Sequence, residues 1–518
     1  MQRRSVPLLL LALSLPTVIL ADGQRINQEG RILGAVPVVT TPTLFNTAAA
    51  DTVTSAMQIM PLDNPWNEDV SALPLLSNSA AMIAQIEADL AAKGSNRQNL
   101  RLFSEMNFVL VPDGQATQPV QFFNYPDESD LNGGTSPYGL YPIPSNLPVE
   151  TWPVGTGSLT LSQWQQDSTN QGGDRHSITV QPGAGYLWET WETKLVGTAW
   201  RASNGAQFNL NSDTLRPAGW TSGDAAGLPM FPALVRYDEC QRGMVEHAMR
   251  LVVAHSRLGP IYPATHAASV GNSTDPNTPA MGQRLRLNAG FAIPANYTTQ
   301  EKAVLLALKK YGALVADNGG FFSISITPDD RYGSSLDHIL NSVPISSFEV
   351  VQSTGPTAGP RSPGAPTADA GPDLTVLLGT PAQLQGATTN ATTVTWSQYS
   401  GSAPVTFGNA AQAATTASFT VPGTYTLMLS AADGVHAVAH SAVVVRVVFT
   451  PTVAPSGSDE ITSFPTNAGH HYRVEWSNDL ITWSTVADNL AGTGVTMSVT
   501  HTGGYTATRH FYRVSVLD

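Results

Sequence analysis

Apolar and polar residues alternate over short stretches along most of the chain, and Gly, Pro and Asn separate these stretches. Such alternation between frequent turn residues is typical of β-strands. Two segments instead repeat their apolar residues at helical spacing. The first covers about 79–94, and the second covers 299–317 behind a Thr298–Glu301 capping box. The pattern predicts a mainly β chain with two packing helices.

The same pattern divides the chain into three β-rich parts. Residues 45–351 contain no long break, and we expect one large jelly-roll or β-sandwich-like domain that includes both helices. Residues 352–366 are rich in Pro, Gly, Ser and Thr, which predicts a linker. Residues 367–448 and 449–518 each contain short strands between turns, which predicts two small β-domains, the first of them immunoglobulin-like.

Charge and the N-terminal residues narrow the cellular setting. A formal net charge of −13 over 518 residues argues against nucleic acid or an anionic membrane surface as partner. Residues 1–21 join a basic start to an apolar run, so we expect a secretory signal peptide and a secreted, periplasmic or cell-surface protein. No later stretch is long and apolar enough to predict a membrane span. The single cysteine, Cys240, is expected to be buried and inert.

Each of the two small β-domains resembles a known module. Residues 367–448 contain ADAGPDLTVLLGTPAQLQG, VTWSQYSG and PGTYTLMLSAADG, which resemble the polycystic-kidney-disease (PKD) type of immunoglobulin-like domain. That resemblance implies a spacer or glycan-adhesive accessory without catalytic residues. Residues 449–518, with FPTNAGHHYRVEWSNDLITWSTV, resemble the small C-terminal β-domain of secreted proteins from Verrucomicrobia-like bacteria. This second resemblance implies a surface or export setting.

The large domain has a resemblance of its own. The motifs DNPWN, GDRH, YLWETWE, LRPAGWTSGDAAGLP, EHAMR and PDDRY are similar to those of a family of uncharacterised secreted bacterial proteins. The resemblance spans about 60–350 and implies a bacterial secreted protein, but it assigns no catalytic role. The polar residues inside these motifs are therefore the first candidates for function.

The stretch GDRHSITVQPGAGYLWETWETK, residues 173–194, predicts a β-hairpin with a PGAG loop. If Val180 pairs with Tyr186, one face carries Asp174, His176, Trp188 and Glu192. A shift of one residue in the pairing would move this set to the other face. Two interpretations follow: an acid/base site with aromatic rings for a sugar, or the charged rim of a sheet.

The next segment adds a turn-rich loop and a histidine. Loop RPAGWTSGD, residues 216–224, places Asp224 beside small residues that leave room for a ligand. Its serine lacks the G-x-S-x-G spacing of a nucleophile elbow. We expect the hairpin and the loop to meet in one polar cleft, with these candidate catalytic residues: Asp174, His176, Glu189, Asp224 and His247. The candidate substrate contacts are Trp188, Trp220, Arg216 and Arg236.

Cofactor and metal motifs are missing from the sequence. It contains no Walker A loop, no G-x-G-x-x-G before a helix, and no HExxH, so we predict neither a cofactor nor a metal. The spacing of His247, His255 and His266 leaves a three-histidine metal site open.

Two function classes remain. The first is a secreted glycoside hydrolase or polysaccharide lyase that uses Asp, Glu and His as acid and base. In this class the linked β-modules would hold the catalytic domain close to its polysaccharide. The alternative is a non-catalytic protein that binds glycans or adheres to cell-surface glycans. The sequence leaves open which class applies, as well as the sugar, the bond and the oligomeric state.

Overall fold

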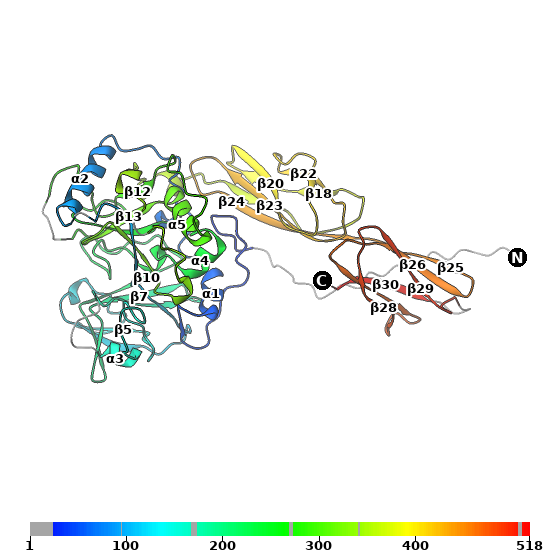
Figure 1. Ribbon diagram of the computed structural model, residues 1–518, viewed down its shortest axis with the longest axis horizontal. Helices are drawn as coiled ribbons and strands as arrows, with labels where there is room; N and C mark the ends of the chain where they lie inside the picture. Colours follow the sequence, from blue (N-terminus) through cyan, green and yellow to red (C-terminus); the bar gives the residue numbers. More distant parts are fainter. Residues whose placement is uncertain are drawn as a thin grey trace. The chain divides into compact units, whose positions relative to one another are not determined.

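The computed structural model describes residues 24–94, 96–166, 173–268, 273–339, 342–505 and 510–517 (Figure 1). The expected signal peptide at 1–21 lies outside these residues. The chain forms two compact units, one over Arg25–Ala365 and one over most of Pro366–Asp518. Both are mainly β, as the alternation of apolar and polar residues predicts. No helix among the described residues has the length and apolar character needed to cross a bilayer.

Three sheets build the Arg25–Ala365 unit. The five-stranded sheet has the order β1 (Thr43–Leu44), β3 (Val109–Leu110), β6 (Ser177–Gln181), β7 (Tyr186–Trp191) and β10 (Asn204–Asn209). The six-stranded sheet has the order β15 (Phe348–Val350), β12 (Arg284–Leu287), β13 (Ala313–Asn318), β11 (Met249–Val253), β14 (Ser323–Ile326) and β2 (Arg101–Ser104). The four-stranded sheet has the order β5 (Tyr138–Tyr141), β4 (Gln118–Phe122), β9 (Ala199–Ala202) and β8 (Lys194–Val196).

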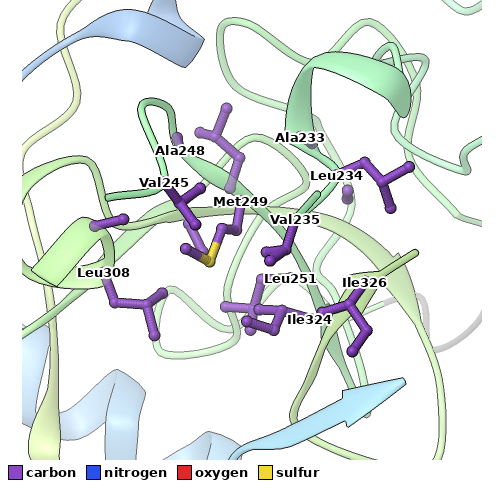
Figure 2. Packing of buried hydrophobic residues seen from close by; sticks show 14 of the residues in the cluster. Ala233, Leu234, Val235, Val245, Ala248, Met249, Leu251, Leu308, Ile324 and Ile326 are labelled. Atoms are coloured by element: carbon purple, nitrogen blue, oxygen red, sulfur yellow. The ribbon is translucent and has the colours of Figure 1, made fainter. Parts of the chain in front are cut away.

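Two apolar layers hold these sheets together. Alternate residues of β6 and β7, among them Ile178 and Leu187, pack into the layer shared with the six-stranded sheet. The opposite face of the five-stranded sheet, including Trp188, packs with Phe122 and Trp200 of the four-stranded sheet. Figure 2 shows the centre of the first layer, with these labelled side chains: Ala233, Leu234, Val235, Val245, Ala248, Met249, Leu251, Leu308, Ile324 and Ile326. The layered arrangement matches the sandwich-like expectation.

The two expected packing helices are present in this unit. They are α2 (Ser79–Ala91) and α5 (Thr299–Lys310), and α5 begins with the predicted capping box. The remaining helices described here are short: α1 (Ala48–Ser55), α3 (Leu161–Gln165) and α4 (Tyr237–Arg242).

The second helix ends earlier than its sequence pattern predicts. We expected it to run to 317, but α5 stops at Lys310 and residues 313–318 form β13. Gly312 has φ +64, a left-handed conformation that terminates a helix readily. A Cβ atom at this position would lie 2.1 Å from the Leu285 carbonyl oxygen. The apolar run after Gly312 is buried as a strand between β11 and β12 instead.

The expected hairpin forms with a register that differs from the prediction by one residue. Val180 pairs with Leu187 rather than with Tyr186, and Ile178 pairs with Glu189. The shift turns Glu189 toward the layer shared with the six-stranded sheet, while Trp188 faces the opposite layer. The predicted face of Asp174, His176, Trp188 and Glu192 is therefore wrong, because Trp188 belongs to the other face.

The second unit contains two β-domains. The strands of the first are β16 (Thr367–Asp369), β17 (Leu374–Leu377), β18 (Ala382–Gln385), β19 (Ala387–Thr389), β20 (Thr393–Ser400), β21 (Thr406–Phe407), β22 (Ala414–Ser418), β23 (Gly423–Ala432) and β24 (Ala439–Val448). Its core contains Trp396, Tyr425, Leu427 and Leu429, as the alternation predicts. The strands of the second are β25 (Thr452–Ser456), β26 (Asp459–Pro465), β27 (His471–Ser477), β28 (Ser484–Ala491), β29 (Thr496–His501) and β30 (Phe511–Val516).

Candidate active site

A cluster of buried charged residues lies between the six-stranded and five-stranded sheets. We name it the Arg250 cluster, and its members are Glu105, Glu150, His176, Asp224, Arg250 and Asp317. Charged side chains are rarely buried unless they are paired, and several together in one place mark a candidate functional site.

Arg250 is the centre of the cluster. It lies on β11, which runs between β13 and β14, and its side chain is 4% exposed. Its Nε and Nη2 donate to the two carboxylate oxygens of Asp224 at 2.7 and 3.0 Å. Nη2 also donates to Asp317 Oδ2 at 2.8 Å, and Nη1 donates to Ser325 Oγ at 3.1 Å. The rigid guanidinium therefore fixes one residue from a loop and one from each neighbouring strand.

Glu105 reaches the same guanidinium from the edge of the sheet. It follows β2, which pairs in parallel with β14. Its Oε1 accepts a hydrogen bond from Ser325 Oγ at 2.9 Å and lies 3.9 Å from Arg250 Nη1. Glu105 and Asp317 thus approach opposite ends of one guanidinium.

His176 connects the hairpin to the loop that carries Asp224. Its Nδ1 lies 3.1 Å from Glu150 Oε2, and its Nε2 lies 2.7 Å from the Gly223 carbonyl oxygen. Burial opposes a charge on the ring, but the Glu150 carboxylate raises the pKa of His176 to about 9. The protonated ring donates through both nitrogens, so His176 holds the hairpin and the loop together. The expected approach of these two segments is therefore present.

Glu105 and Asp317 are the accessible acids of the cluster. Their side chains are 23% and 22% exposed, whereas those of Asp224 and Glu150 are 1% and 6% exposed. Burial raises the pKa of Glu105 to about 7, against the opposing effect of Arg250. Burial also raises the pKa of Asp317 to about 6, again opposed by Arg250, with a further rise from Asp224. Two such carboxyl groups are suited to exchange protons near neutral pH.

Two residues next to the cluster have unusual backbone conformations. Thr151, directly after Glu150, has φ 67, and Arg175, directly before His176, has φ 53. A β-branched residue at positive φ is a genuine outlier, and such strain is concentrated at functional sites. The Thr151 amide also donates to the Glu105 carbonyl oxygen at 2.8 Å, which ties this turn to the accessible acid.

Comparison with known proteins identifies one part of the chain. Residues 370–447 match a family model of the PKD domain. They form a PKD-type module. No curated protein matches the chain. The PKD module lies in the second unit, so the match does not bear on the chemistry of the Arg250 cluster.

The structure brings three of the five candidate catalytic residues together. His176 and Asp224 belong to the Arg250 cluster, and Glu189 is buried beside it. Oε1 of Glu189 accepts hydrogen bonds from the amides of Met230 and Phe231 at 2.7 and 3.1 Å. Burial raises the pKa of Glu189 to about 8, although these hydrogen bonds oppose the shift. With a side chain that is 0% exposed, Glu189 supports the loop rather than facing a ligand.

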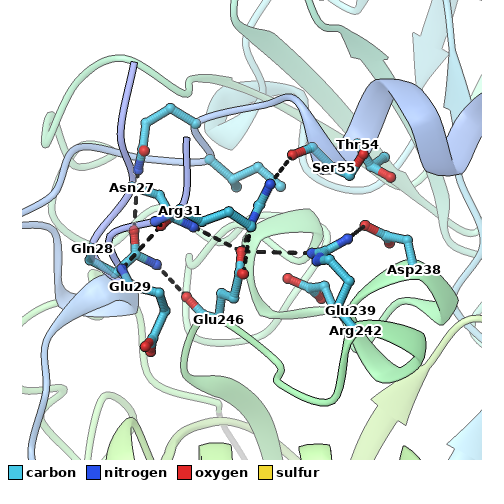
Figure 3. A network of polar contacts seen from close by, with 12 residues as sticks. Asn27, Gln28, Glu29, Arg31, Thr54, Ser55, Asp238, Glu239, Arg242 and Glu246 are labelled. Atoms are coloured by element: carbon cyan, nitrogen blue, oxygen red, sulfur yellow. Dashed lines mark hydrogen bonds and ion pairs between the residues drawn. The ribbon is translucent and has the colours of Figure 1, made fainter. Parts of the chain in front are cut away.

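The other two candidates lie elsewhere. Asp174 is exposed at the end of the hairpin. His247 lies in a different network, where its Nε2 is 3.2 Å from Glu239 Oε2. Figure 3 shows the neighbouring part of that network, in which Arg31 and Asn27 of the N-terminal segment bind Glu246 at 2.6 and 2.8 Å. This network ties residues 25–31 to the unit, which therefore begins before the expected residue 45.

The candidate substrate contacts are mostly engaged within the protein. Trp188 is a core residue, and Trp220 is half-buried with the guanidinium of Arg216 over its ring at 5.4 Å. Arg216 binds Asp130 and the backbone of Glu128. Arg236 binds Glu239 at 2.6 Å.

The three-histidine metal site does not form. His255 Nδ1 lies 3.3 Å from Asp89, and His266 Nδ1 lies 2.6 Å from the Ala225 carbonyl oxygen, while His247 contacts Glu239. Among the described residues of the large unit, no group of three His, Cys, Asp or Glu ligands lies close enough to hold a metal ion.

Four cluster residues were absent from the expected site: Glu105, Glu150, Arg250 and Asp317. Arg250 and Asp317 did carry a signal, since each interrupts an apolar strand, in HAMRLVV and ALVADN. A charge inside an apolar strand requires a buried partner. Glu105 and Glu150 carried none, because only the folded chain brings them next to His176 and Arg250. The PKD module adds no residue to this site.

Proposed function

We propose that the Arg25–Ala365 unit is a polysaccharide-active enzyme, a glycoside hydrolase or lyase, with Glu105 and Asp317 as acid and base. The observation that carries the proposal is the pair of partly exposed carboxyl groups on one buried guanidinium, with pKa values of about 7 and 6. Pairs of titratable groups with separated pKa values are typical of acid–base sites.

The two carboxyl groups would divide the proton transfers between them. Between pH 6 and 7, Asp317 is mainly ionised and Glu105 is mainly protonated. Glu105 then donates a proton to the leaving glycosidic oxygen. Asp317 activates a water molecule in a hydrolase, or removes a sugar proton in a lyase. Arg250, Asp224 and His176 position these acids and do not themselves exchange protons with the substrate.

The substrate class and location rest on chain organisation. A PKD-type module follows the large unit, and such accessory modules suit a protein that works on an extended glycan. The net charge of −13 disfavours nucleic acid. The basic and apolar start of the sequence supports secretion or cell-surface attachment in a bacterium.

The test is cleavage of a panel of polysaccharides by the full chain, followed by reducing ends and by unsaturated products. Glu105→Gln and Asp317→Asn should each lower the rate by about 100-fold or more while circular dichroism stays unchanged. The control is Glu349→Gln, which removes a carboxylate of the same sheet that binds Arg286 at 2.6 Å. Unchanged cleavage by both folded variants, or an equal loss in Glu349→Gln, would contradict the assignment.

The second candidate is glycan binding without catalysis. Tyr125, 41% exposed, and half-buried Trp191 have ring centroids 6.1 Å apart at an interplanar angle of 30°. Beside them Asn124 donates to Glu192 at 3.2 Å. Aromatic rings with neighbouring polar groups suit a sugar ring. If the chain binds polysaccharides without product, and Tyr125→Ala removes binding, this second function holds and the first does not.

A further inference from the structure

Two histidines and a glutamate converge in the last β-domain, far from the Arg250 cluster in sequence. Glu460 on β26 pairs directly with His501 on β29, and His510 immediately precedes β30. One carboxylate oxygen of Glu460 and one nitrogen of each imidazole lie within 4.8 Å of one another. Three strands thus bring three ligand atoms of mixed N and O type to one place.

His510 has unused binding capacity there. Its side chain is 8% exposed, and its Nδ1 has no hydrogen-bond partner among the described residues. The same Nδ1 lies 3.6 Å from Glu460 Oε2, which is too far for a hydrogen bond. A buried polar atom without a partner is costly, and an unplaced ion is one of its standard explanations.

The surroundings hold these ligands in position. The Tyr512 hydroxyl donates to Glu460 Oε2 and lies 2.7 Å from His501 Nδ1. The Trp476 ring packs against both imidazoles, with centroid distances of 5.1 Å to His501 and 4.7 Å to His510. Hydrogen bonds from a ligand to an outer residue are a regular feature of metal sites, because they fix the ring orientation.

Gly504 keeps space open beside the group. A Cβ atom there would lie 2.7 Å from His501 Nδ1 and 2.8 Å from the Tyr512 hydroxyl oxygen. Any other residue would push the histidine and the tyrosine out of their present positions.

We propose that Glu460, His501 and His510 bind a divalent transition-metal ion of the zinc type. Two imidazoles and one carboxylate match the preference of Zn²⁺, whereas Ca²⁺ and Mg²⁺ prefer oxygen ligands. Metal–ligand bonds of about 2.0–2.2 Å would draw the three atoms closer together than they now are. Three protein ligands leave a fourth position for water. The ion would tie β26 and β29 of one sheet to the chain that enters β30 of the other.

The experiment uses the full chain, stripped with a chelator and then titrated with Zn²⁺ in equilibrium dialysis, with metal measured by mass spectrometry. We expect one Zn²⁺ per chain and a melting transition that rises with Zn²⁺, because the folded state alone assembles the site. The His501→Ala/His510→Ala double variant should bind at least about tenfold more weakly. The control is His470→Ala/His471→Ala, which removes two histidines from the same domain and should retain wild-type binding.

A second variant covers the case in which the double variant does not fold. Glu460→Gln keeps the size of the side chain and should weaken Zn²⁺ binding at least about tenfold with unchanged circular dichroism. Wild-type affinity in folded Glu460→Gln, or equal loss in the His470/His471 control, would overturn the proposal. Activity toward polysaccharides is not a readout here, so failure of this site leaves the proposed function untouched.

Discussion

Exposure separates the acidic residues of the Arg250 cluster into two groups. Asp224 is 1% exposed and binds Arg250 through both oxygens, so it balances the buried charge and fixes the guanidinium. Glu105 and Asp317 bind the same guanidinium but keep 23% and 22% of their side chains accessible. Only the second pair can meet a ligand, and this decides which carboxylates carry the proposed chemistry.

Glu189 makes a pH-dependent contribution to stability. Its pKa is about 8 in the folded chain, and the unfolded chain loses this proton at a lower pH. The folded state therefore holds a proton that the unfolded state lacks, and stability falls as pH rises through this window toward 8. Glu189→Gln cannot lose a proton, so at pH 8 it should be more stable than wild type by roughly 2–5 kcal/mol.

Urea denaturation at pH 5 and pH 8 checks this prediction. Wild type should lose more stability between the two values than Glu189→Gln does. Glu87→Gln on α2 serves as the control for removing a carboxylate. Parallel curves for wild type and Glu189→Gln would show that Glu189 is ionised in the folded chain.

At this scale the sequence predicts residue types better than residue contacts. His176, Asp224 and Glu189 were expected to be near one another, and they are. The hairpin register was missed by one residue, because the alternation fits both pairings equally and only packing against the neighbouring sheet selects one. Glu105 and Glu150 join the site through contacts between distant segments, which no local pattern records.

At the scale of elements, the end of α5 shows where periodicity stops being informative. Val304, Leu305 and Leu308 are buried helical residues, and Val315 continues their spacing although it belongs to β13. The change occurs at Gly312, whose positive φ and close backbone neighbour permit only glycine. Apolar runs look alike in a buried strand and a buried helix, so the glycine was the more reliable signal.

Gly312→Ala should therefore destabilise the large unit strongly. The added Cβ would meet the Leu285 carbonyl oxygen at 2.1 Å, in addition to the strain of a positive φ. We expect a loss of about 3 kcal/mol or more in the free energy of unfolding, measured by urea denaturation.

A matched control separates strain from collision. Gly197 also has φ +64, but a Cβ there would have no neighbour within 4 Å. Gly197→Ala should cost only about 1–2 kcal/mol, the penalty of the conformation itself. Equal losses for the two variants would show that the close approach to β12 does not matter.

At the scale of the whole molecule, the expected linker is partly held on the large unit. Arg361, 4% exposed, binds Glu68 at 3.0 Å and the Asp63 carbonyl oxygen at 2.6 Å. Thr354 donates to Glu68 as well. The Pro- and Gly-rich composition of 352–366 predicted a joint, but a single buried arginine has more influence on its order than composition does.

Arg361→Ala should release this segment. The variant leaves Glu68 buried without its partner, so limited proteolysis should produce a new early cut within 352–361, while wild type is first cut after 361. Arg473→Ala, which removes an arginine that is 39% exposed, should leave the cleavage pattern unchanged. Early cleavage of wild type within 352–361 would show that the arginine does not hold the segment.

The central claim is that Glu105 and Asp317 exchange protons with a polysaccharide near neutral pH. The most direct test is kcat/KM for polysaccharide cleavage by the full chain between pH 4 and 9. We predict a bell with a rising limb near pH 6, as Asp317 ionises, and a falling limb near pH 7, as Glu105 loses its proton. In Glu105→Gln the falling limb should disappear together with most of the activity. A flat profile between pH 5 and 8, or a falling limb that persists at wild-type rates in Glu105→Gln, would contradict the account.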